Sequence, residues 1–353
     1  MKSLLLDISK IKNLYSGLGH VGDELAKGIA VQAQQEWELK YLLPKRFEDR
    51  YGSKVSYFFL KAWRKIINSR IKADVWHMTS ADSRYEFNRK SKLLLTIHDL
   101  NFLTEKSGDK LEKRKQRLQK KINQASAITA ISAFTKNEVL KHMKVPEGKE
   151  IQVIYNGVAN PMERPASQPA VAKGEHKPFF FTIGAIMWKK NFHTLIPMMK
   201  HFPEYELWIA GKGIEGDYGK KISLAIQEQQ LGDRVKMIGE ISNEEKNWAY
   251  QNCEAFLFPS LLEGFGIPPI EAMYCGKPAF LANRTSLPEI GGKLAYYWDD
   301  FEADDMAKVV TAGLADFNAK TDGKELLVQH ASQFSWSNTI SEYIALYDQL
   351  AKQ

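Results

Sequence analysis

A chain of 353 residues exceeds the size at which one hydrophobic core usually keeps growing, so two domains are expected. With 44% hydrophobic and 26% charged residues, two cysteines and no apolar run long enough to cross a bilayer, the sequence excludes a membrane-spanning protein and a disulfide scaffold. The 49 Lys and Arg against 42 Asp and Glu give a net charge of +7, which favours phosphorylated ligands, acidic lipid surfaces or nucleic acid without choosing among them.

The amino-terminal stretch MKSLLLDIS carries an apolar run that Asp7 interrupts, too short for a secretory signal. We therefore expect a cytoplasmic protein. Cys253 and Cys275 lack the spacing of zinc ligands, so the sequence predicts buried thiols and no structural metal.

In the first half of the chain, short apolar or β-branched runs alternate with amphipathic segments. This alternation predicts a parallel sheet with crossover helices, because parallel strands need a long return connection. The predicted strands are LLLDI, KYLL, ADVWHM, KLLLTIHD, SAITAIS and IQVIYNG, with helices over residues 22–33 and 134–143.

The stretch GLGHVG, residues 17–22, has the glycine spacing by which many Rossmann domains hold a dinucleotide. Here residues 9–16 separate it from the first strand, and WELKYLL ends at Pro44 without an acidic residue for a ribose. We therefore do not expect an NAD site. The glycines would still let the backbone approach a diphosphate at the start of a helix from about Val21, unless they form only a flexible loop.

Two further segments of the first half mix cations with apolar residues. KLEKRKQRLQKK, residues 110–121, suits a helix with Leu111, Leu118 and Ile122 on one side. SYFFLKAWRKIINSRIK, residues 56–72, combines aromatic and basic side chains. Basic amphipathic helices of this sort lie on anionic membranes. The alternative for each is a buried apolar stripe with a solvated basic face.

Residues 160–177, NPMERPASQPAVAKGEHK, lack periodicity and predict a linker. A second alternating series follows, with FFFTIGA, YELWIAG, RVKMIGE, AFLFPS and KPAFLA as strands. Two doubly wound domains would leave a cleft at the carboxyl ends of their strands, where ligands bind. The last helix, residues 337–350, carries an apolar face that must dock against something.

The most informative segment is FLFPSLLEGFGIPPIEAMYCG, residues 256–276. It predicts a buried strand, a loop with Glu263, and a helix begun by Pro268 and Pro269 that carries Glu271 about one turn in. Helix N–H groups suit phosphate, and carboxylates accept hydrogen bonds from sugar hydroxyls. A sugar attached to a diphosphate offers both groups. The alternatives are a helix cap with a surface ion pair, and a hydrolase carboxylate pair, which the adjacent phosphate site disfavours.

A second basic element, Trp188-Lys189-Lys190-Asn191, follows the strand FFFTIGA. Lysines on a strand-to-helix loop bring positive charge to a phosphate at the carboxyl edge of a sheet, although most lysine pairs are merely solvated. The acidic pairs 299–300 and 304–305 look like helix-start residues, so we expect no metal ligands there.

Together these motifs resemble a retaining glycosyltransferase of family 4 with the GT-B fold, over nearly the whole chain. The resemblance implies two Rossmann-like α/β domains, 1–160 for the acceptor and 178–335 for the nucleotide-sugar donor, which face each other across a cleft. It also implies a linker over 161–177 and a helix over 336–353 that packs back on the first domain. The motifs, in the order of the family, are GLGHVGDELAKGIA, LLLTIHDL, SAITAISAFTKNEVLKHMKVPEGKEIQVIYNGV, FTIGAIMWKKN, EGFGIPPIEAMYCGKPAF, SLPEIGG and FSWSNTISEYIALY.

The resemblance also implies roles for single residues. Lys190, with Lys189, would neutralise the donor diphosphate, and Glu271 would hold the ribose hydroxyls. His98 would contact the donor sugar from the opposite domain, while His77 is expected to be structural. The sugar and its phosphates would be held by Glu263 and the backbone of Gly264, Phe265 and Gly266, with Gly17, Leu18 and Gly19 closing over the diphosphate.

One position departs from the pattern: the family usually has Pro-Arg-Lys-Asn where this chain has Trp188-Lys189-Lys190-Asn191. A forked guanidinium is thereby replaced by a point charge, which puts bidentate gripping of a phosphate in doubt.

The reaction implied is transfer of a hexose from a nucleotide sugar such as GDP-mannose or UDP-hexose, by a mannosyltransferase or glucosyltransferase. It would retain anomeric configuration and need no metal or cofactor. The acceptor would be a glycan or a lipid-linked glycan of bacterial surface polysaccharide or glycolipid synthesis, with peripheral contact to the inner face of the cytoplasmic membrane. A non-catalytic sugar-nucleotide-binding protein is the alternative. No nucleic acid partner is expected, because no binding signature for one is present.

Overall fold

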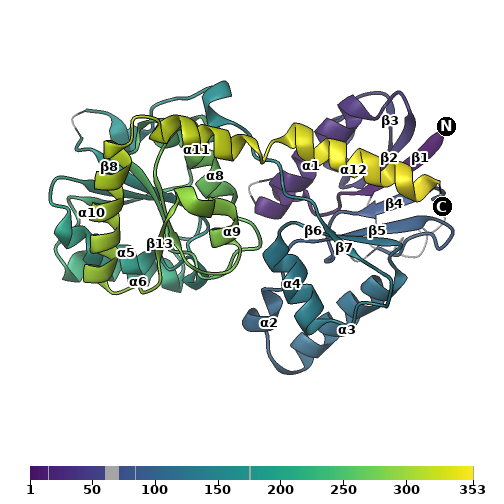
Figure 1. Ribbon diagram of the computed structural model, residues 1–353, viewed down its shortest axis with the longest axis horizontal. Coiled ribbons are helices and arrows are strands. Elements are labelled where there is room, and N and C mark those ends of the chain that lie inside the picture. The colour runs from purple at the N-terminus through teal and green to yellow at the C-terminus, as the bar shows by residue number, and fades with distance from the viewer. Residues whose placement is uncertain (15, 60–70, 84, 175, 353) are drawn as a thin grey trace. The chain divides into compact units, whose positions relative to one another are not determined.

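The computed structural model describes residues 1–14, 16–59, 71–83, 85–174 and 176–352. The chain divides into two compact units (Figure 1). Unit 1 is Met1–Gly157 with Phe334–Gln353, and unit 2 is Val158–Gln333. Each unit contains one parallel sheet flanked by helices, so the predicted α/β class with two doubly wound domains is confirmed.

The sheet of unit 1 has the strand order β3-β2-β1-β4-β5-β6-β7, and all its pairs are parallel. The order reverses between β1 and β4, which marks the switch point of a doubly wound sheet. The elements are β1 (Lys2–Asp7), α1 (Gly17–Gln32), β2 (Trp37–Leu43), η1 (Lys45–Phe47), β3 (Val55–Phe59), β4 (Val75–Met78), β5 (Lys92–Ile97), α2 (Phe102–Glu105), α3 (Gly108–Gln124), β6 (Ala127–Ala130), α4 (Ala133–His142), β7 (Ile151–Val153) and α12 (Trp336–Ala351).

Different helices cover the two faces of this sheet (Figure 1). Leu4 and Leu6 of β1 pack in the cluster with α1 and α12, whereas Leu5 packs in the cluster with α3 and α4. All three side chains are fully buried. A strand in a parallel sheet that is covered on both faces is apolar at every position. The strand β1 therefore has three consecutive leucines, and not the alternation of apolar and polar residues that is typical of a half-exposed strand.

The strand β3 was not predicted. It covers the start of the segment 56–72 that we expected to be a basic helix, and this expectation is wrong for the residues of β3, which pair with β2. The run VSYFF is rich in β-branched and aromatic residues, which favour a pleated, half-buried strand. Residues 60–70 of the segment lie outside the described residues.

The sheet of unit 2 has the order β10-β9-β8-β11-β12-β13, again with all pairs parallel and a switch point, here between β8 and β11. Its elements are η4 (Pro161–Glu163), η5 (Ala170–Ala172), β8 (Phe179–Ile183), η6 (Trp188–Lys190), η7 (Phe192–Thr194), α5 (Leu195–Met198), η8 (Met199–His201), β9 (Glu206–Ala210), α6 (Asp217–Glu228), β10 (Val235–Gly239), α7 (Asn243–Asn252), β11 (Ala255–Phe258), α8 (Ile267–Tyr274), β12 (Ala279–Ala282), α9 (Leu287–Gly291), η9 (Gly292–Leu294), β13 (Tyr296–Trp298), α10 (Ala303–Ala319) and α11 (Gly323–Ser332).

The described residues of the expected linker, 161–174 and 176–177, lie in unit 2, and the start of this segment is held against α7. Asn247 donates from its side chain to the carbonyl of Pro165 at 2.8 Å, and Gln251 donates to that of Pro161 at 3.0 Å. Side-chain hydrogen bonds from α7 therefore help to hold this aperiodic segment, together with the buried side chains of Pro161 and Ala172.

The last helix, α12, belongs to unit 1 and packs against α1. Its apolar face buries Ile340, Tyr343 and Tyr347 in the cluster that contains β1. The Tyr347 hydroxyl forms a hydrogen bond of 2.7 Å with Nδ1 of His77. The other ring nitrogen, Nε2, lies 2.8 Å from Thr96 Oγ1. His77 is fully buried, as expected of a structural histidine.

Candidate functional site

The sequence-predicted site residues of unit 2 gather at its switch point. Lys190 lies in the loop after β8, and Glu263 lies in the loop after β11, the two strands between which the order reverses. The backbone ties the loops together, because the N–H of Leu261 donates to the carbonyl of Lys189 at 2.7 Å. In open α/β sheets this crevice outside the strand ends is where ligands bind.

Lys190 and Glu263 form an ion pair with 2.5 Å between Nζ and Oε1. Both side chains are largely buried, with 14% of Lys190 and 16% of Glu263 exposed. The ammonium also lies 4.9 Å from the ring centre of Phe258, at the end of β11. Ser260 donates to the same Oε1 of Glu263 at 2.7 Å. The positive charge of Lys190 and the acceptor oxygens of Glu263 are therefore held side by side at the carboxyl edge of the unit 2 sheet.

The loop from Glu263 to Gly266 is held by hydrogen bonds from the loop that follows β12. Ser286 donates to the carbonyls of Glu263 at 3.1 Å and Phe265 at 2.7 Å, while the N–H of Glu263 donates to Thr285 Oγ1 at 3.2 Å. Gly266 has a φ of 119°, which L side chains rarely adopt. The loop is thereby shaped to lead into α8, whose first turn carries the predicted prolines.

Glu271 lies in α8, about one turn in as predicted, and only 5% of it is exposed. Its Oε1 is 2.5 Å from Lys246 Nζ, and its Oε2 accepts from the Tyr250 hydroxyl at 2.9 Å. Both partners come from α7, one turn apart. The carboxylate is thus oriented through both oxygens. Glu271 can still accept hydrogen bonds from a ligand, because a carboxylate has further acceptor sites beyond these two.

In unit 1 the glycine stretch lies inside a helix and not before it. We expected the helix from about Val21, but α1 begins at Gly17. The physical reason is its cap: Ser16 accepts a hydrogen bond from the N–H of Gly19 at 3.1 Å. Gly17, Leu18 and Gly19 form the first turn of α1, where backbone N–H groups have no partner within the helix.

His98 follows β5 at the carboxyl edge of the same sheet. Its Nε2 lies 2.7 Å from the carbonyl oxygen of Thr79. A carbonyl only accepts hydrogen bonds, so Nε2 carries the proton and the lone pair of the neutral ring is on Nδ1. Burial lowers the pKa of His98, which favours this neutral form.

Several residues of the site were missed by sequence reasoning. Ser286 lies in the motif SLPEIGG, which carried the family resemblance without a role for its serine, and Ser260 follows directly after a predicted strand. Lys246 and Tyr250 gave no signal, since only the packing of α7 on α8 brings them to Glu271.

The described residues show neither a metal-binding cluster nor a helix that could span a membrane. Among the described residues, no group of three or more His, Cys, Asp or Glu side chains is arranged to hold a metal ion. Within the same part of the chain, no helix combines the length and apolarity that crossing a bilayer requires. Of the two thiols, Cys253 is buried and Cys275 is half-buried.

Comparison with known proteins gives two family matches that follow each other along the chain. Residues 32–159 match the family "Glycosyltransferase Family 4", and residues 163–322 match "Glycosyl transferases group 1". The chain belongs to glycosyltransferase family 4. Like the rest of this family, it is an enzyme that transfers a glycosyl group.

The relatives of this family 4 glycosyltransferase include two mannosyltransferases from Escherichia coli. O-antigen chain mannosyltransferase B is 24% identical over 276 residues, which are 74% of this chain and 71% of that protein. Serotype-specific mannosyltransferase WbdA is 27% identical over 226 residues, 61% of this chain, but the match spans only 28% of its own length.

A solved structure shows the same fold. Anabaena HepE, in complex with UDP and glucose, superposes with a TM-score of 0.77 at 19% identity and covers 99% of each chain. The two parallel α/β units together with this likeness establish the GT-B fold.

Proposed function

We propose that this enzyme moves a hexose from a nucleoside-diphosphate sugar to a glycan or lipid-linked acceptor in bacterial surface polysaccharide or glycolipid synthesis. The observation that carries the proposal is the pairing of Lys190 with Glu263 at the switch point of unit 2. The relative named O-antigen chain mannosyltransferase B favours a polysaccharide product and a mannose donor, for which we propose GDP-mannose. The UDP and glucose in HepE keep a UDP-hexose as the other candidate.

In this proposal the donor diphosphate is bound by Lys190 and by the loop that begins α8. Departure of the nucleoside diphosphate develops negative charge on the β-phosphate. The ammonium of Lys190 and the N–H groups of Gly264, Phe265 and Gly266 at a positive helix end would stabilise that charge. Lys189 precedes Lys190 and adds a second cation. Because these groups supply the positive charge, the proposed reaction needs neither a divalent metal nor a cofactor.

Glu263 and Glu271 would accept hydrogen bonds from hydroxyl groups of the donor. Glu263 lies beside Lys190, so it suits hydroxyls of the sugar that is attached to the phosphate. Glu271 lies deeper in α8 and is oriented by Lys246 and Tyr250, which suits the ribose. Fixed acceptors of this kind place a ligand without reorganising when it binds.

Unit 1 would contribute His98 and the first turn of α1 to the donor. The unprotonated Nδ1 of His98 can accept a hydrogen bond from a sugar hydroxyl. Because burial lowers its pKa, the ring is a weak proton acceptor, so we propose that His98 positions the sugar and does not act as the base. Gly17 and Leu18 offer N–H groups to a diphosphate, while the N–H of Gly19 caps the helix through Ser16 and leaves Gly19 to keep the backbone accessible. We further propose front-side attack with retention of configuration, in which the leaving phosphate accepts the proton of the acceptor hydroxyl.

The test is calorimetric binding of UDP, GDP, ADP and NAD to the wild type and to Lys190→Ala, with chelator present. We expect one nucleoside diphosphate to bind, and the variant to bind it at least tenfold more weakly, a loss of about 1.4 kcal/mol. Turnover of the matching donor with an acceptor glycan, read by the anomeric proton couplings of the product, then tests retention. Binding of NAD alone, or binding without any turnover or donor hydrolysis, would contradict the proposal.

We also propose that α3 brings unit 1 to an anionic membrane surface. Its apolar residues Leu118 and Ile122 are buried inside unit 1, so they are not available for insertion into a bilayer. Four cations remain exposed along one side of the helix at helical spacing, namely Lys110, Lys113, Arg117 and Lys120. A contact made by cations alone contributes about 1 kcal/mol per side chain near the surface.

Co-sedimentation with phosphatidylglycerol vesicles checks this membrane contact. We expect Lys113→Ala/Arg117→Ala to bind more weakly than the wild type, and binding to fall as salt rises. The exposed lysines of unit 2 in Lys173→Ala/Lys200→Ala provide a control with the same loss of charge. Equal binding by both variants would contradict a role for α3.

A further inference from the structure

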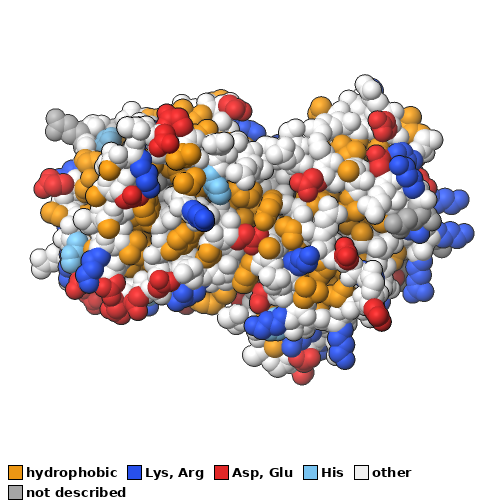
Figure 2. All heavy atoms as spheres, viewed as in Figure 1, with side chains coloured by type: hydrophobic (Ala, Val, Ile, Leu, Met, Phe, Trp, Pro, Cys, Tyr) orange, Lys and Arg blue, Asp and Glu red, His pale blue; other side chains and the backbone are white. Residues whose placement is uncertain are grey.

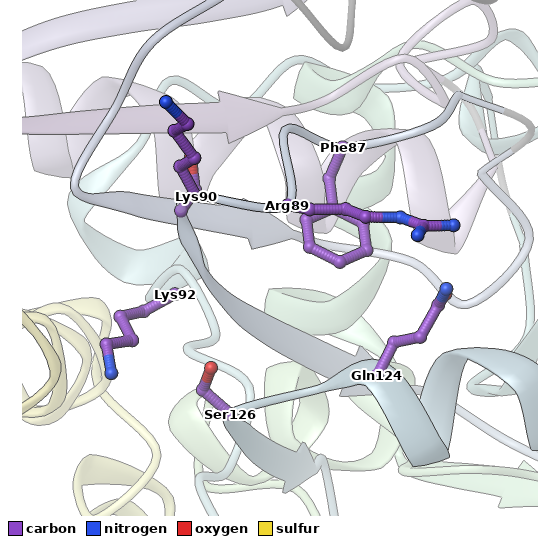
Figure 3. Close-up of a pocket in the computed structure, with 7 residues that line it drawn as sticks. Phe87, Arg89, Lys90, Lys92, Gln124 and Ser126 are labelled. Carbon is purple, nitrogen blue, oxygen red and sulfur yellow. The ribbon is translucent and has the colours of Figure 1, made fainter.

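A polar pocket lies in unit 1 at the edge of the sheet where the strands begin. It has a volume of about 490 Å³. Figure 3 shows Arg89 and Gln124 turned toward each other on one side of the pocket, with the ring of Phe87 beneath Arg89. Lys92 and Ser126 lie on its other side, and Lys90 extends away from them.

This pocket is separate from the site described above. Lys92 is the first residue of β5, whereas His98 follows the last residue of the same strand. Six residues of extended chain, at about 3.3 Å per residue, place the two ends roughly 20 Å apart. The pocket is therefore at the amino edge of the sheet, and the first turn of α1 and His98 are at the carboxyl edge.

The pocket is cationic and contains no carboxylate in its lining. Among the described residues, none of Arg89, Lys90 and Lys92 has an acidic partner within 4.0 Å. Figure 2 shows Lys and Arg side chains gathered over the same end of unit 1, near the amino terminus. Ser126 and the Gln124 amide add neutral hydrogen-bond donors to the lining.

An independent observation points to a ligand at this place. Ser91 also lines the pocket, and only 6% of it is exposed. Its hydroxyl is buried and has no hydrogen-bond partner among the described residues. Buried hydroxyl groups are nearly always paired, and an unpaired one destabilises the fold. Rotation of this hydroxyl toward the pocket would let a bound anion with several oxygens supply the missing acceptor.

We propose that this pocket binds a phosphate group, carried either by a soluble phosphate compound or by a phospholipid headgroup. A guanidinium beside an ammonium, with hydroxyl and amide donors, is the donor set that phosphate oxygens prefer. The volume lies in the range of small-molecule sites, about 300–1,000 Å³, which leaves room for a group larger than the phosphate itself. The inference does not depend on the donor or acceptor assigned above.

The experiment compares three variants of the full chain with the wild type. Arg89→Ala/Lys92→Ala removes the two cations on either side of the pocket, and Ser91→Ala removes the unpaired hydroxyl. Lys54→Ala/Lys144→Ala removes two exposed cations of unit 1 outside the pocket and is the charge-matched control. Calorimetry with inorganic phosphate and glycerol 3-phosphate tests soluble ligands. Co-sedimentation with phosphatidylglycerol or phosphatidylcholine vesicles tests the headgroup.

We expect Arg89→Ala/Lys92→Ala to weaken binding about tenfold or more, and the control to stay within about twofold of the wild type. Ser91→Ala should weaken binding without lowering the melting temperature of the free protein. Loss of glycerol 3-phosphate binding in the pocket variants assigns a soluble ligand, and loss confined to phosphatidylglycerol vesicles assigns a headgroup. If the pocket variants and the control behave alike with every probe, the proposal is wrong.

Discussion

Lys190 and Glu263 are 73 positions apart in the sequence, yet the Lys190 ammonium and the Glu263 carboxylate lie 2.5 Å apart at the end of neighbouring strands. The pairing means that the cation proposed to meet the donor phosphate is already oriented before a ligand binds. Ser260 and Phe258, from the end of β11 and the residues after it, complete its surroundings.

The first prediction concerns this ammonium. We expect Lys190→Ala to lower kcat about 10²–10³-fold, the usual effect of removing one preorganised group that stabilises developing charge. Lys190→Arg should recover part of the activity, because the charge remains but its geometry changes. Steady-state kinetics with the donor at saturation measure the effect. Lys212→Ala, which removes an exposed cation of unit 2, is the control. A kcat within threefold of the wild type, roughly 0.7 kcal/mol, would exclude this role.

The second prediction separates ligand binding from stability at Glu271. Tyr250→Phe removes one hydrogen bond to the carboxylate, so we expect it to lower the free energy of unfolding by about 1 kcal/mol and to leave donor affinity nearly unchanged. Glu271→Gln removes the charge that would face the ribose and should weaken nucleoside diphosphate binding about tenfold. Urea unfolding and calorimetry on both variants provide the measurements. If Glu271→Gln is less stable than the wild type but binds the nucleoside diphosphate with the same affinity, the role of Glu271 is limited to its ion pair with Lys246.

The third prediction uses the two glycines of the first turn of α1. A Cβ on Gly19 would lie 1.9 Å from the carbonyl oxygen of Asn13, whereas a Cβ on Gly17 meets nothing within 4 Å. We therefore expect Gly19→Ala to destabilise unit 1 by about 1–3 kcal/mol through a forced backbone shift. Gly17→Ala should leave stability unchanged but raise the KM for the donor, if a diphosphate approaches this backbone. An unchanged KM in Gly17→Ala, with the melting temperature of the wild type, would remove Gly17 from the donor site.

The parts of the fold that could be predicted from the sequence are those that local patterns encode. The buried runs LLLDI, FFFTIGA and AFLFPS each became a central strand, and the prolines at 268 and 269 fixed the start of α8. The order of loops along the chain then brought Lys190 and Glu263 to one edge. These features depend on residues within a few positions of one another and on the general rules of parallel sheets.

The remaining features depend on contacts between distant residues. No local pattern shows that Lys246 would reach Glu271, because the pair forms only when α7 packs beside α8. The start of α1 was placed too late, since the glycines argue against a helix and only the cap by Ser16 compensates for them. The unpaired hydroxyl of Ser91 likewise follows from packing and not from sequence.

The last prediction concerns acid stability and the docking of α12. Burial lowers the pKa of His77 to about 3, because the charged ring would lose its water, and the nearby His98 ring acts in the same direction. Between that value and the unfolded pKa of about 6.5, the unfolded chain binds more protons than the folded one, so the free energy of unfolding rises with pH. Stability is therefore lost as the pH falls below about 6.5, by about 2 kcal/mol at pH 5 from His77 alone. Hydrogen exchange of the β4 and α12 amides at pH 7 and pH 5 measures this loss.

We expect His77→Gln to reduce the pH dependence, and the exposed His176→Gln to leave it unchanged. The lowered pKa of His98 acts in the same direction, so some dependence remains in His77→Gln. An identical pH dependence in His77→Gln and the wild type would show that His77 is not the group that weakens unit 1 in acid.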